Sequence, residues 1–438
     1  MNKQIIFSLI TLLTLGVFGY SISRIVSFFK LTREIFSVDR IGERINITLL
    51  VAFGQTKILR KPVIGLVHAI VYWGFLVITI GTLEMIIDGL INTERIFGNA
   101  GIFYSFITAS GEIFAALIIL ACVIFLVRRH IIKIKRFDGV EMTKGSSIDA
   151  TIALTLIGLL MISLLGTNVG YLNLTNTSVK GYFPISSLLV NAFAKIEPES
   201  MEIFYEINWW AHVLLVYIFA NILPYSKHFH VFMAVPNVFL SKLGPLTKIT
   251  NVEEITKEVK MMLNPDTAFA NPPEGETAQP SRFGVKDVND ASWKNYLDAL
   301  TCTECGRCTD VCPASITGKK LSPRKIFVDF RKRMNEVGPG LVKNGSSFTD
   351  GKSLIGDYVS AEELWACTTC NACLQECPVN IDHPSLIIDM RRYMVLEESS
   401  APAQINNMFA NIENNGAPWP FAQTERMNWA QDIYTDTE

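Results

Sequence analysis

Eight of the nine cysteines lie between residues 302 and 377, in two groups with one spacing, C-x2-C-x2-C-x3-C-P. The groups are Cys302, Cys305, Cys308 and Cys312, and then Cys367, Cys370, Cys373 and Cys377. Three thiolates at this spacing wrap one face of a four-iron cluster, and the fourth, redirected by the proline, binds the other cluster of a pair. The pattern predicts two [4Fe–4S] clusters, which carry single electrons.

The fourth cysteines are expected to cross over between the clusters. One cluster then takes Cys302, Cys305, Cys308 and Cys377, and the other takes Cys367, Cys370, Cys373 and Cys312. Zinc sites or disulfides are the alternatives. A structural zinc site uses two C-x2-C pairs and does not need a third equally spaced cysteine in each group. A cytoplasmic domain holds few stable disulfides. The ninth cysteine, Cys122, lies in an apolar run where a lone cysteine is usually a small buried residue, and we assign it no role.

The composition excludes an ordinary soluble enzyme. The 438 residues are 49% hydrophobic and only 18% charged, whereas soluble domains carry about 25% charged residues. With 39 basic and 41 acidic residues, the chain has no excess positive charge to attract a polyanion, so no nucleic-acid partner is expected.

Five apolar runs are long enough to cross about 30 Å of hydrocarbon as helices. They cover residues 4–29, 63–88, 102–127, 149–170 and 208–233. The first has no small-residue cleavage site and is followed by basic residues, so we expect a retained span rather than a signal peptide.

Charge in the connecting loops predicts the orientation. Basic residues gather between the first two spans and after the third, whereas the loops 89–101 and 171–207 carry mainly acidic ones. Because basic loops stay on the cytoplasmic side, we expect the N-terminus outside and the cysteine groups in the cytoplasm.

The chain divides into four expected parts. Residues 1–240 form the membrane domain, 241–296 a linker, 297–395 the cysteine domain, and 396–438 an extended arm. In the cysteine domain apolar residues recur at helical spacing, and some 54 residues separate Cys312 from Cys367. The expected fold class is therefore mainly α, a five-helix transmembrane bundle followed by a cytoplasmic α-helical ferredoxin domain.

Histidines on the spans could hold b-type haem, since imidazole is a common axial ligand. His68 and His230 both lie near cytoplasmic span ends, and we pair them, with His228 as the alternative to His230. On one continuous helix His212 and His230 would share a face about 27 Å apart, so His212 would lie near the outer surface. His212 has no partner histidine there and would hold a second haem alone, or none. Ordinary interfacial histidines remain the other interpretation.

Three basic residues near the cytoplasmic span ends, Arg60, Lys61 and Lys227, have two possible roles. They could meet haem propionates, or they could meet lipid phosphates as juxtamembrane basic residues usually do.

Taken together, the cysteine groups, His68 and the stretch from Trp209 through His212 to His230 resemble membrane-anchored iron–sulfur subunits related to heterodisulfide reductase. In those proteins a nitrate-reductase-gamma-like cytochrome b domain is joined to a two-cluster α-helical ferredoxin domain. The resemblance implies a bacterial or archaeal cytoplasmic-membrane protein that passes electrons between quinone, b haem, two [4Fe–4S] clusters and a cytoplasmic oxidoreductase.

Two departures from that family matter. Ile78 stands where the gamma-like domain commonly has a second histidine, which leaves the number of haems at one or two. Related catalytic subunits carry Cys-Cys-Gly repeats, which this chain lacks, so any catalytic site is expected on another subunit with such repeats. The alternative function is a membrane-anchored iron–sulfur redox sensor or scaffold without haem.

Overall fold

The computed structural model describes residues 2–33, 38–175, 179–264, 282–431 and 433. Over these residues the chain is built from helices joined by turns, with two isolated backbone bridges as its only β-type contacts. The predicted mainly α class is confirmed.

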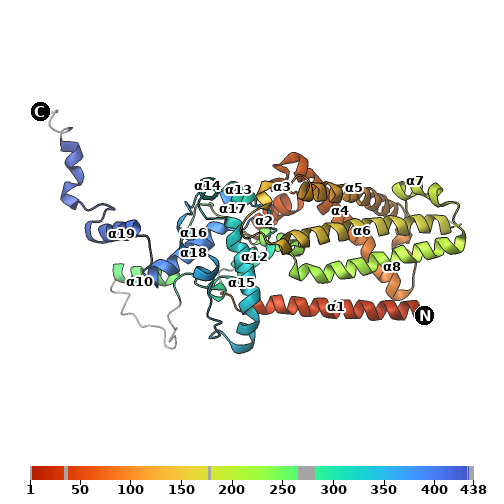
Figure 1. Cartoon of the computed structure of the whole chain (residues 1–438), viewed down its shortest axis with the longest axis horizontal. Helices are drawn as coiled ribbons and strands as arrows, with labels where there is room; N and C mark the ends of the chain where they lie inside the picture. The colour runs from red at the N-terminus through yellow and green to blue at the C-terminus, as the bar shows by residue number, and fades with distance from the viewer. Residues whose placement is uncertain (1, 34–37, 176–178, 265–281, 432, 434–438) are drawn as a thin grey trace. The chain divides into compact units, whose positions relative to one another are not determined.

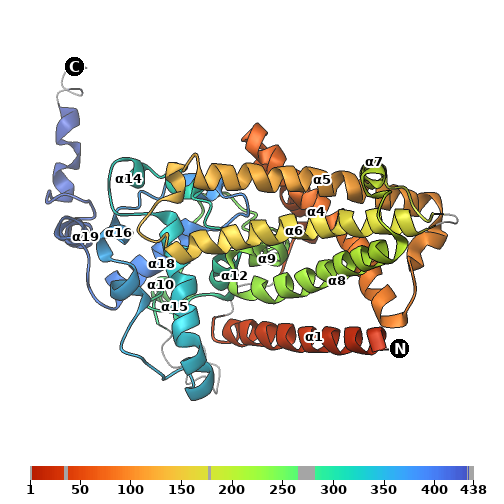
Figure 2. The ribbon, with the colours of Figure 1, turned by 45° about the vertical axis from the view of Figure 1, so that its right-hand side comes forward.

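Five helices are long and apolar enough to cross a membrane. They are α1 (Asn2–Phe29), α4 (Pro62–Ile91), α5 (Ile102–His130), α6 (Lys144–Leu174) and α8 (Pro198–Ile222). Figures 1 and 2 show α5, α6 and α8 side by side, with α4 packed on α5 and α1 lying along α4 and α8. Leu12 and Leu13 of α1 are exposed, as expected of side chains that face lipid rather than water.

The fifth span differs from the prediction of 208–233. Helix α8 begins at Pro198 and ends at Ile222, and two 3-10 turns then lead to α9 (His230–Phe239). Pro224 explains the break, because proline has no backbone N–H to continue the helical ladder. His212 and His230 therefore lie on different helices, and the expectation that they share one helix face was wrong.

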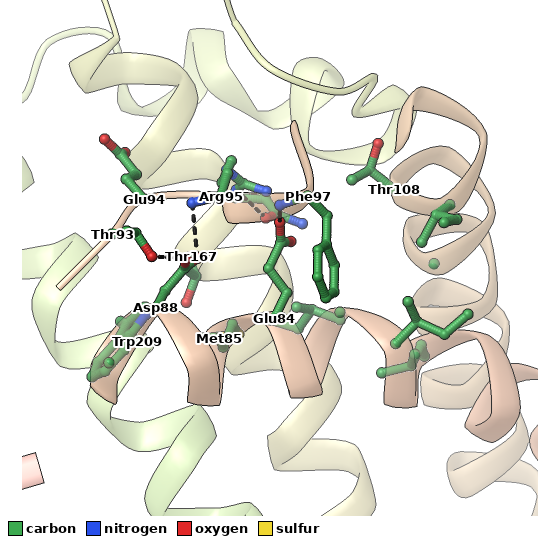
Figure 3. Close-up of a pocket in the computed structure, with 18 of the residues that line it drawn as sticks. Glu84, Met85, Asp88, Thr93, Glu94, Arg95, Phe97, Thr108, Thr167 and Trp209 are labelled. Atoms are coloured by element: carbon green, nitrogen blue, oxygen red, sulfur yellow. Dashed lines mark hydrogen bonds between the residues drawn. The ribbon is translucent and has the colours of Figure 1, made fainter. Parts of the chain in front are cut away.

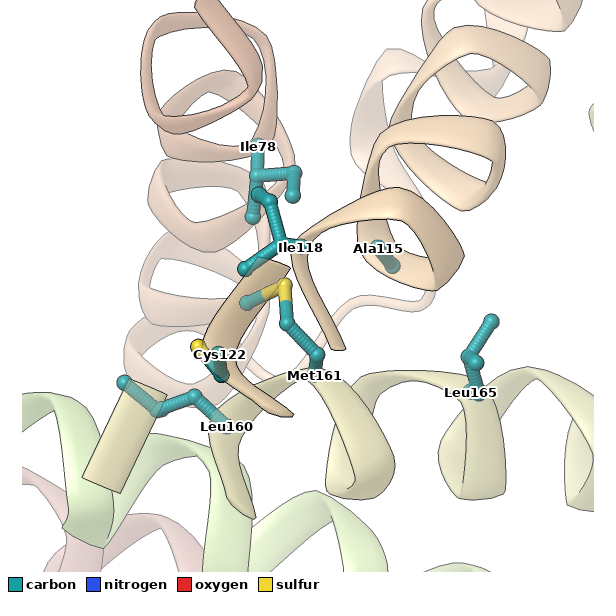
Figure 4. Packing of buried hydrophobic residues seen from close by; sticks show 7 residues of the cluster. All are labelled: Ile78, Ala115, Ile118, Cys122, Leu160, Met161 and Leu165. Carbon is teal, nitrogen blue, oxygen red and sulfur yellow. The ribbon is translucent and has the colours of Figure 1, made fainter. Parts of the chain in front are cut away.

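The centre of the bundle is an apolar cluster from α4, α5 and α6 (Figure 4). Its members are Ile78, Ala115, Ile118, Cys122, Leu160, Met161 and Leu165. Cys122 packs there as a small buried side chain.

Short helices cap one end of the bundle, opposite the N-terminal end of α1 (Figures 1 and 2). They are α12 (Trp293–Thr301), α13 (Arg307–Asp310), α14 (Pro313–Ile316), α15 (Pro323–Asn344), α16 (Ala361–Trp365) and α17 (Ala372–Glu376). The core of this lobe is the inner face of α15, where Phe327, Phe330 and Met334 are fully buried. Helix α12 packs between α15 and α9, which joins the lobe to the bundle.

The loop between the first two spans contains short helices of its own. It contains α2 (Ile41–Ile47), a π-helical turn (Thr48–Phe53) and α3 (Thr56–Leu59). Arg44 on α2 is buried and donates to the Phe239 carbonyl at the end of α9 (2.9 Å), so this loop supports α9.

Part of the expected linker 241–296 is folded. Helix α10 (Glu253–Leu263) lies within it, Val288 and Ala291 are fully buried just before α12, and residues 265–281 lie outside the described residues. Residues 250–286 and 385–438 make a second compact unit, which holds α10, most of α18 (His383–Leu396) and α19 (Ala403–Asn415).

Candidate metal centres

The two cysteine groups adopt the same backbone conformation. Glu304 and Thr369 occupy equivalent positions with φ of 58° and 54°, and Gly306 and Asn371 follow with φ of 74° and 60°. Positive φ is uncommon for residues other than glycine, so its repetition at both positions marks one shared fold of the loop. Each loop then enters a short helix, α13 or α17, and these two helices pack together.

Electrostatic interactions link cysteines of one group to cysteines of the other. Burial raises the pKa of the Cys308 thiol, and the charges of Cys305, Cys302, Cys377 and Cys373 raise it further. Burial also raises the pKa of Cys373, whose charged neighbours include Cys367, Cys312 and Cys370. The fourth cysteine of each group thus interacts with at least one cysteine of the other group, and the crossed ligand sets stay a prediction.

The donors suit iron–sulfur clusters better than zinc or disulfides. None of the nine cysteines, all within the described part of the chain, forms a disulfide bond. Structural zinc uses two C-x2-C pairs, whereas a four-iron cluster takes four thiolates spread around several irons.

Backbone amides also point at the sulfurs. The amides of Thr369 and Ile381 donate to the sulfurs of Cys367 and Cys377, both at 3.4 Å. Hydrogen bonds to cluster sulfurs are one means by which a protein sets a cluster's potential. Burial raises the pKa of Cys302 to about 11 and of Cys377 to about 12, so iron binding must displace protons from these thiols.

Basic residues of the loop between the first two spans attach the cysteine lobe to the bundle. Lys57 on α3 donates to the carbonyl of Cys377 (3.2 Å), and Arg60 donates to the carbonyl of Gln375 (3.2 Å). Lys61 lies 3.9 Å from the Asp310 carboxylate. Arg60 and Lys61, expected at haem propionates or lipid phosphates, therefore contact this lobe.

Glu304, between two cluster cysteines, is the centre of a buried ion cluster that the sequence reasoning missed. Its carboxylate accepts from Lys227 (3.3 Å), from Arg331 and from the Ser146 hydroxyl. Burial raises the pKa of Glu304, but the charges of Arg331 and Lys227 outweigh this and hold the pKa below its ordinary value. The available signal was a carboxylate where the second group has Thr369.

His68 and His230 interact electrostatically at this end of the bundle. His68 on α4 is half-buried, and its Nδ1 atom is buried without a hydrogen-bond partner. His230, the first residue of α9, donates from Nδ1 to the carbonyl of Lys227 (3.1 Å), which leaves Nε2 with a lone pair. Burial and the charges of His228 and His68 lower the pKa of His230 to about 3, so the ring stays neutral.

The other two candidate histidines have different surroundings. His228 Nδ1 lies 2.9 Å from the Ser226 hydroxyl and 3.4 Å from the Asp149 carboxylate, so its ring is engaged by polar groups. His212 on α8 donates from Nδ1 to the Leu160 carbonyl (3.0 Å), and its Nε2 is buried without a partner.

At the opposite end of the bundle lies a cavity of about 330 Å³, lined by carboxylates and apolar side chains from α4 (Figure 3). Glu84 accepts from the hydroxyl of Tyr104 (2.8 Å) and the amide of Phe97 (2.9 Å). Asp88 accepts from the Thr93 hydroxyl (2.6 Å) and the Arg95 amide (2.8 Å). These carboxylates thus hold the loop after α4 in place, and no histidine is among the described residues that line the cavity.

Comparisons with known proteins agree with the iron–sulfur chemistry. Residues 301–381 match the 4Fe-4S dicluster domain. The probable iron-sulfur-binding oxidoreductase FadF of Bacillus subtilis is 28% identical over 98% of this chain and 61% of its own length. EtfAB:quinone oxidoreductase of Syntrophomonas wolfei is 25% identical over 97% of this chain and 59% of its own.

A shorter match links the cysteine lobe to heterodisulfide reductases. One subunit of the ferredoxin/F(420)H(2)-dependent CoB-CoM heterodisulfide reductase of Methanosarcina acetivorans is 35% identical over 24% of this chain and 52% of its own length. No solved structure matches the chain.

The chain is therefore similar to iron–sulfur oxidoreductases and to heterodisulfide reductase subunits, as the sequence predicts. It has a two-cluster ferredoxin domain and five helices able to span a membrane, which supports electron transfer at a membrane. It spans about three fifths of the length of the two full-chain relatives. The resemblance to the nitrate reductase gamma domain stays a prediction.

Proposed function

We propose that this chain is a membrane-bound electron-transfer subunit. It passes electrons, in either direction, between the quinone pool, a b-type haem and two [4Fe–4S] clusters, and to or from a cytoplasmic oxidoreductase. The observation that carries the proposal is the electrostatic interaction between His68 and His230, at the end of the bundle where the cysteine lobe is attached.

Each proposed metal group would be held by residues of this chain. The crossed cysteine sets would hold the clusters, and His68 and His230 would bind the haem iron through their imidazoles. These groups, when bound, accept and release single electrons. The chain keeps the His230 ring neutral and fixes its orientation through the Lys227 carbonyl, as carbonyls commonly do for metal-binding histidines.

His212 is the candidate for a second haem. Its Nδ1 bonds the Leu160 carbonyl, as Nδ1 of His230 bonds the Lys227 carbonyl, and its Nε2 is buried without a partner, which favours a ligand there. Ile78, one of the apolar residues at the bundle centre, supplies no second imidazole. A haem at His212 would therefore have one protein ligand.

The orientation follows from the basic loops. Three basic residues of the loop between the first two spans contact the cysteine lobe: Lys57, Arg60 and Lys61. The basic loops and the clusters would therefore lie on the same side of the membrane. By the positive-inside rule this side is the cytoplasm, and the N-terminus is outside. The proposed setting is the cytoplasmic membrane of a bacterium or archaeon.

Quinone enters the proposal from the printed name of one relative, EtfAB:quinone oxidoreductase. The cytoplasmic partner would carry the substrate chemistry, on a site with Cys-Cys-Gly repeats. The reason is that eight cysteines of this chain are assigned to the two clusters by this proposal and the ninth, Cys122, is buried in the bundle core.

The deciding experiment is an optical spectrum of the purified, detergent-solubilised protein before and after addition of a reduced menaquinone analogue. Haem and iron are quantified on the same sample. A b-type band that appears with the quinol supports the proposal. Intact clusters without haem would overturn it and favour the sensor or scaffold.

A further inference from the structure

We propose that the two clusters have different places on the electron route. The cluster of Cys302, Cys305, Cys308 and Cys377 is the membrane-side cluster, and the cluster of Cys312, Cys367, Cys370 and Cys373 exchanges electrons with the soluble partner. Glu304 and Lys227 are the positioning residues that tie the membrane-side cluster to the haem site. This inference rests on the proposed function.

The first cysteine loop lies against the helices that carry the two histidines. Arg307, between Cys305 and Cys308, is buried, donates to the Lys57 carbonyl (3.3 Å) and interacts electrostatically with His68. Thr301, just before the first cysteine, donates to the Met233 carbonyl on α9 (3.3 Å). The loop therefore reaches the surroundings of both His68 on α4 and His230 on α9.

Lys227 makes a direct bridge between the loop and His230. Its carbonyl accepts the His230 Nδ1 proton at 3.1 Å, and its ammonium contacts the Glu304 carboxylate at 3.3 Å. Both charged side chains are less than a tenth exposed. Breaking a buried ion pair is costly. A substitution of Glu304 therefore disturbs Lys227, whose carbonyl orients the His230 ring.

The second loop faces water. Cys370 is the one exposed cysteine among the eight, although Cys312 and Cys373 of its set are buried. The first set has no exposed cysteine. Next to Cys312, the side chain of Ile316 is 68% exposed. Thr369 occupies the position equivalent to Glu304. Its hydroxyl donates to the backbone carbonyl of its neighbour Thr368 (2.7 Å). A redox group that must exchange electrons with a separate protein needs such an open surface.

The first test locates each cluster relative to water and membrane. The full chain is reconstituted in lipid nanodiscs, the clusters are reduced, and their electron paramagnetic resonance signals are assigned with the variants Cys305→Ser and Cys370→Ser. A water-soluble dysprosium chelate is expected to accelerate relaxation of the second cluster more. A nickel-chelating lipid is expected to accelerate that of the first. The reverse order would overturn the inference.

This measurement needs no haem, so it separates the two proposals. If the optical spectrum shows no haem, the proposed function fails while the relaxation data still decide the order of the clusters. If haem is present and the relaxation order is reversed, only the inference fails.

The second test uses the matched positions of the two loops. Glu304→Gln leaves the charge of Lys227 uncompensated near the haem site, which favours the reduced haem, so the midpoint potential of the haem is expected to rise. Thr369→Ser, at the equivalent position, is expected to leave it unchanged. A haem potential that responds to Thr369→Ser and not to Glu304→Gln would overturn the assignment.

Discussion

The two cysteine loops share their spacing and backbone conformation but differ in surroundings. The first has Glu304 buried among Lys227, Arg331 and Ser146, and the second has Cys370 exposed. The cysteines and the residues with positive φ are common to both loops and define the cluster-binding conformation. The residues between the cysteines differ, and they determine the surroundings of each cluster.

The largest effects come from removing one ligand of either set. Cys305→Ser is expected to abolish or convert the signal of the first cluster, and Cys370→Ser that of the second, because each removes a thiolate from one crossed set. Electron paramagnetic resonance of the reduced protein measures both signals separately. Two unchanged cluster signals in either variant would contradict the ligand assignment.

The crossing itself can be tested with the fourth cysteines. Cys377→Ser is expected to affect the same signal as Cys305→Ser, although the two residues belong to different groups in the sequence. If it instead affects the same signal as Cys370→Ser, each group holds its own cluster and the crossed sets are wrong.

A second large effect is expected on the bundle side of the comparison. His68→Ala removes a proposed axial ligand, so the low-spin haem spectrum should be lost while both cluster signals persist. The matched control is His130→Ala, because His130 at the end of α5 bonds the Thr151 hydroxyl (3.0 Å) and is not a proposed ligand. A normal haem spectrum in His68→Ala would refute the pairing with His230.

The sequence predicted the elements that depend on local pattern. The cysteine spacing predicted the domain that residues 301–381 match, and uniform apolar runs predicted the first four spans. The apolar pattern does not predict the start of α8, because Glu199, Glu202 and Glu206 interrupt it. It does not predict the end of α8 either, because apolar residues continue beyond Pro224. Periodicity cannot place a break that a single proline causes.

The bridge between bundle and lobe could not be predicted. Lys227 and Glu304 are 77 residues apart, and each alone is an ordinary charged residue. Only the fold shows that they pair and that both are buried. Lys227 was expected at haem propionates or lipid phosphates, and its ammonium instead bonds Glu304 and the Ser146 carbonyl (2.7 Å).

A smaller, thermodynamic effect is expected where the first loop is held to the bundle. Arg324 on α15 and Glu141 before α6 form a buried pair at 2.6 Å, each 1% exposed. Arg324 also donates to the Arg136 carbonyl, against which Gly306 of the first loop packs. Arg324→Met leaves Glu141 buried without its partner, so the free energy of unfolding should fall by about 3–5 kcal/mol. Thermal unfolding in detergent, followed by loss of helical circular dichroism, measures this.

The smallest effect is expected at the ion pair beside the second loop. Lys320 and Glu362 lie 2.6 Å apart and are 69% and 58% exposed. Exposed pairs contribute little to stability, so Lys320→Gln should leave the unfolding transition close to that of the wild type. Lys320→Gln is thus the surface counterpart of Arg324→Met. Equal destabilisation by the two variants would mean that the second loop is held as firmly as the first, and the contrast between a membrane-side and a solvent-facing loop would then be lost.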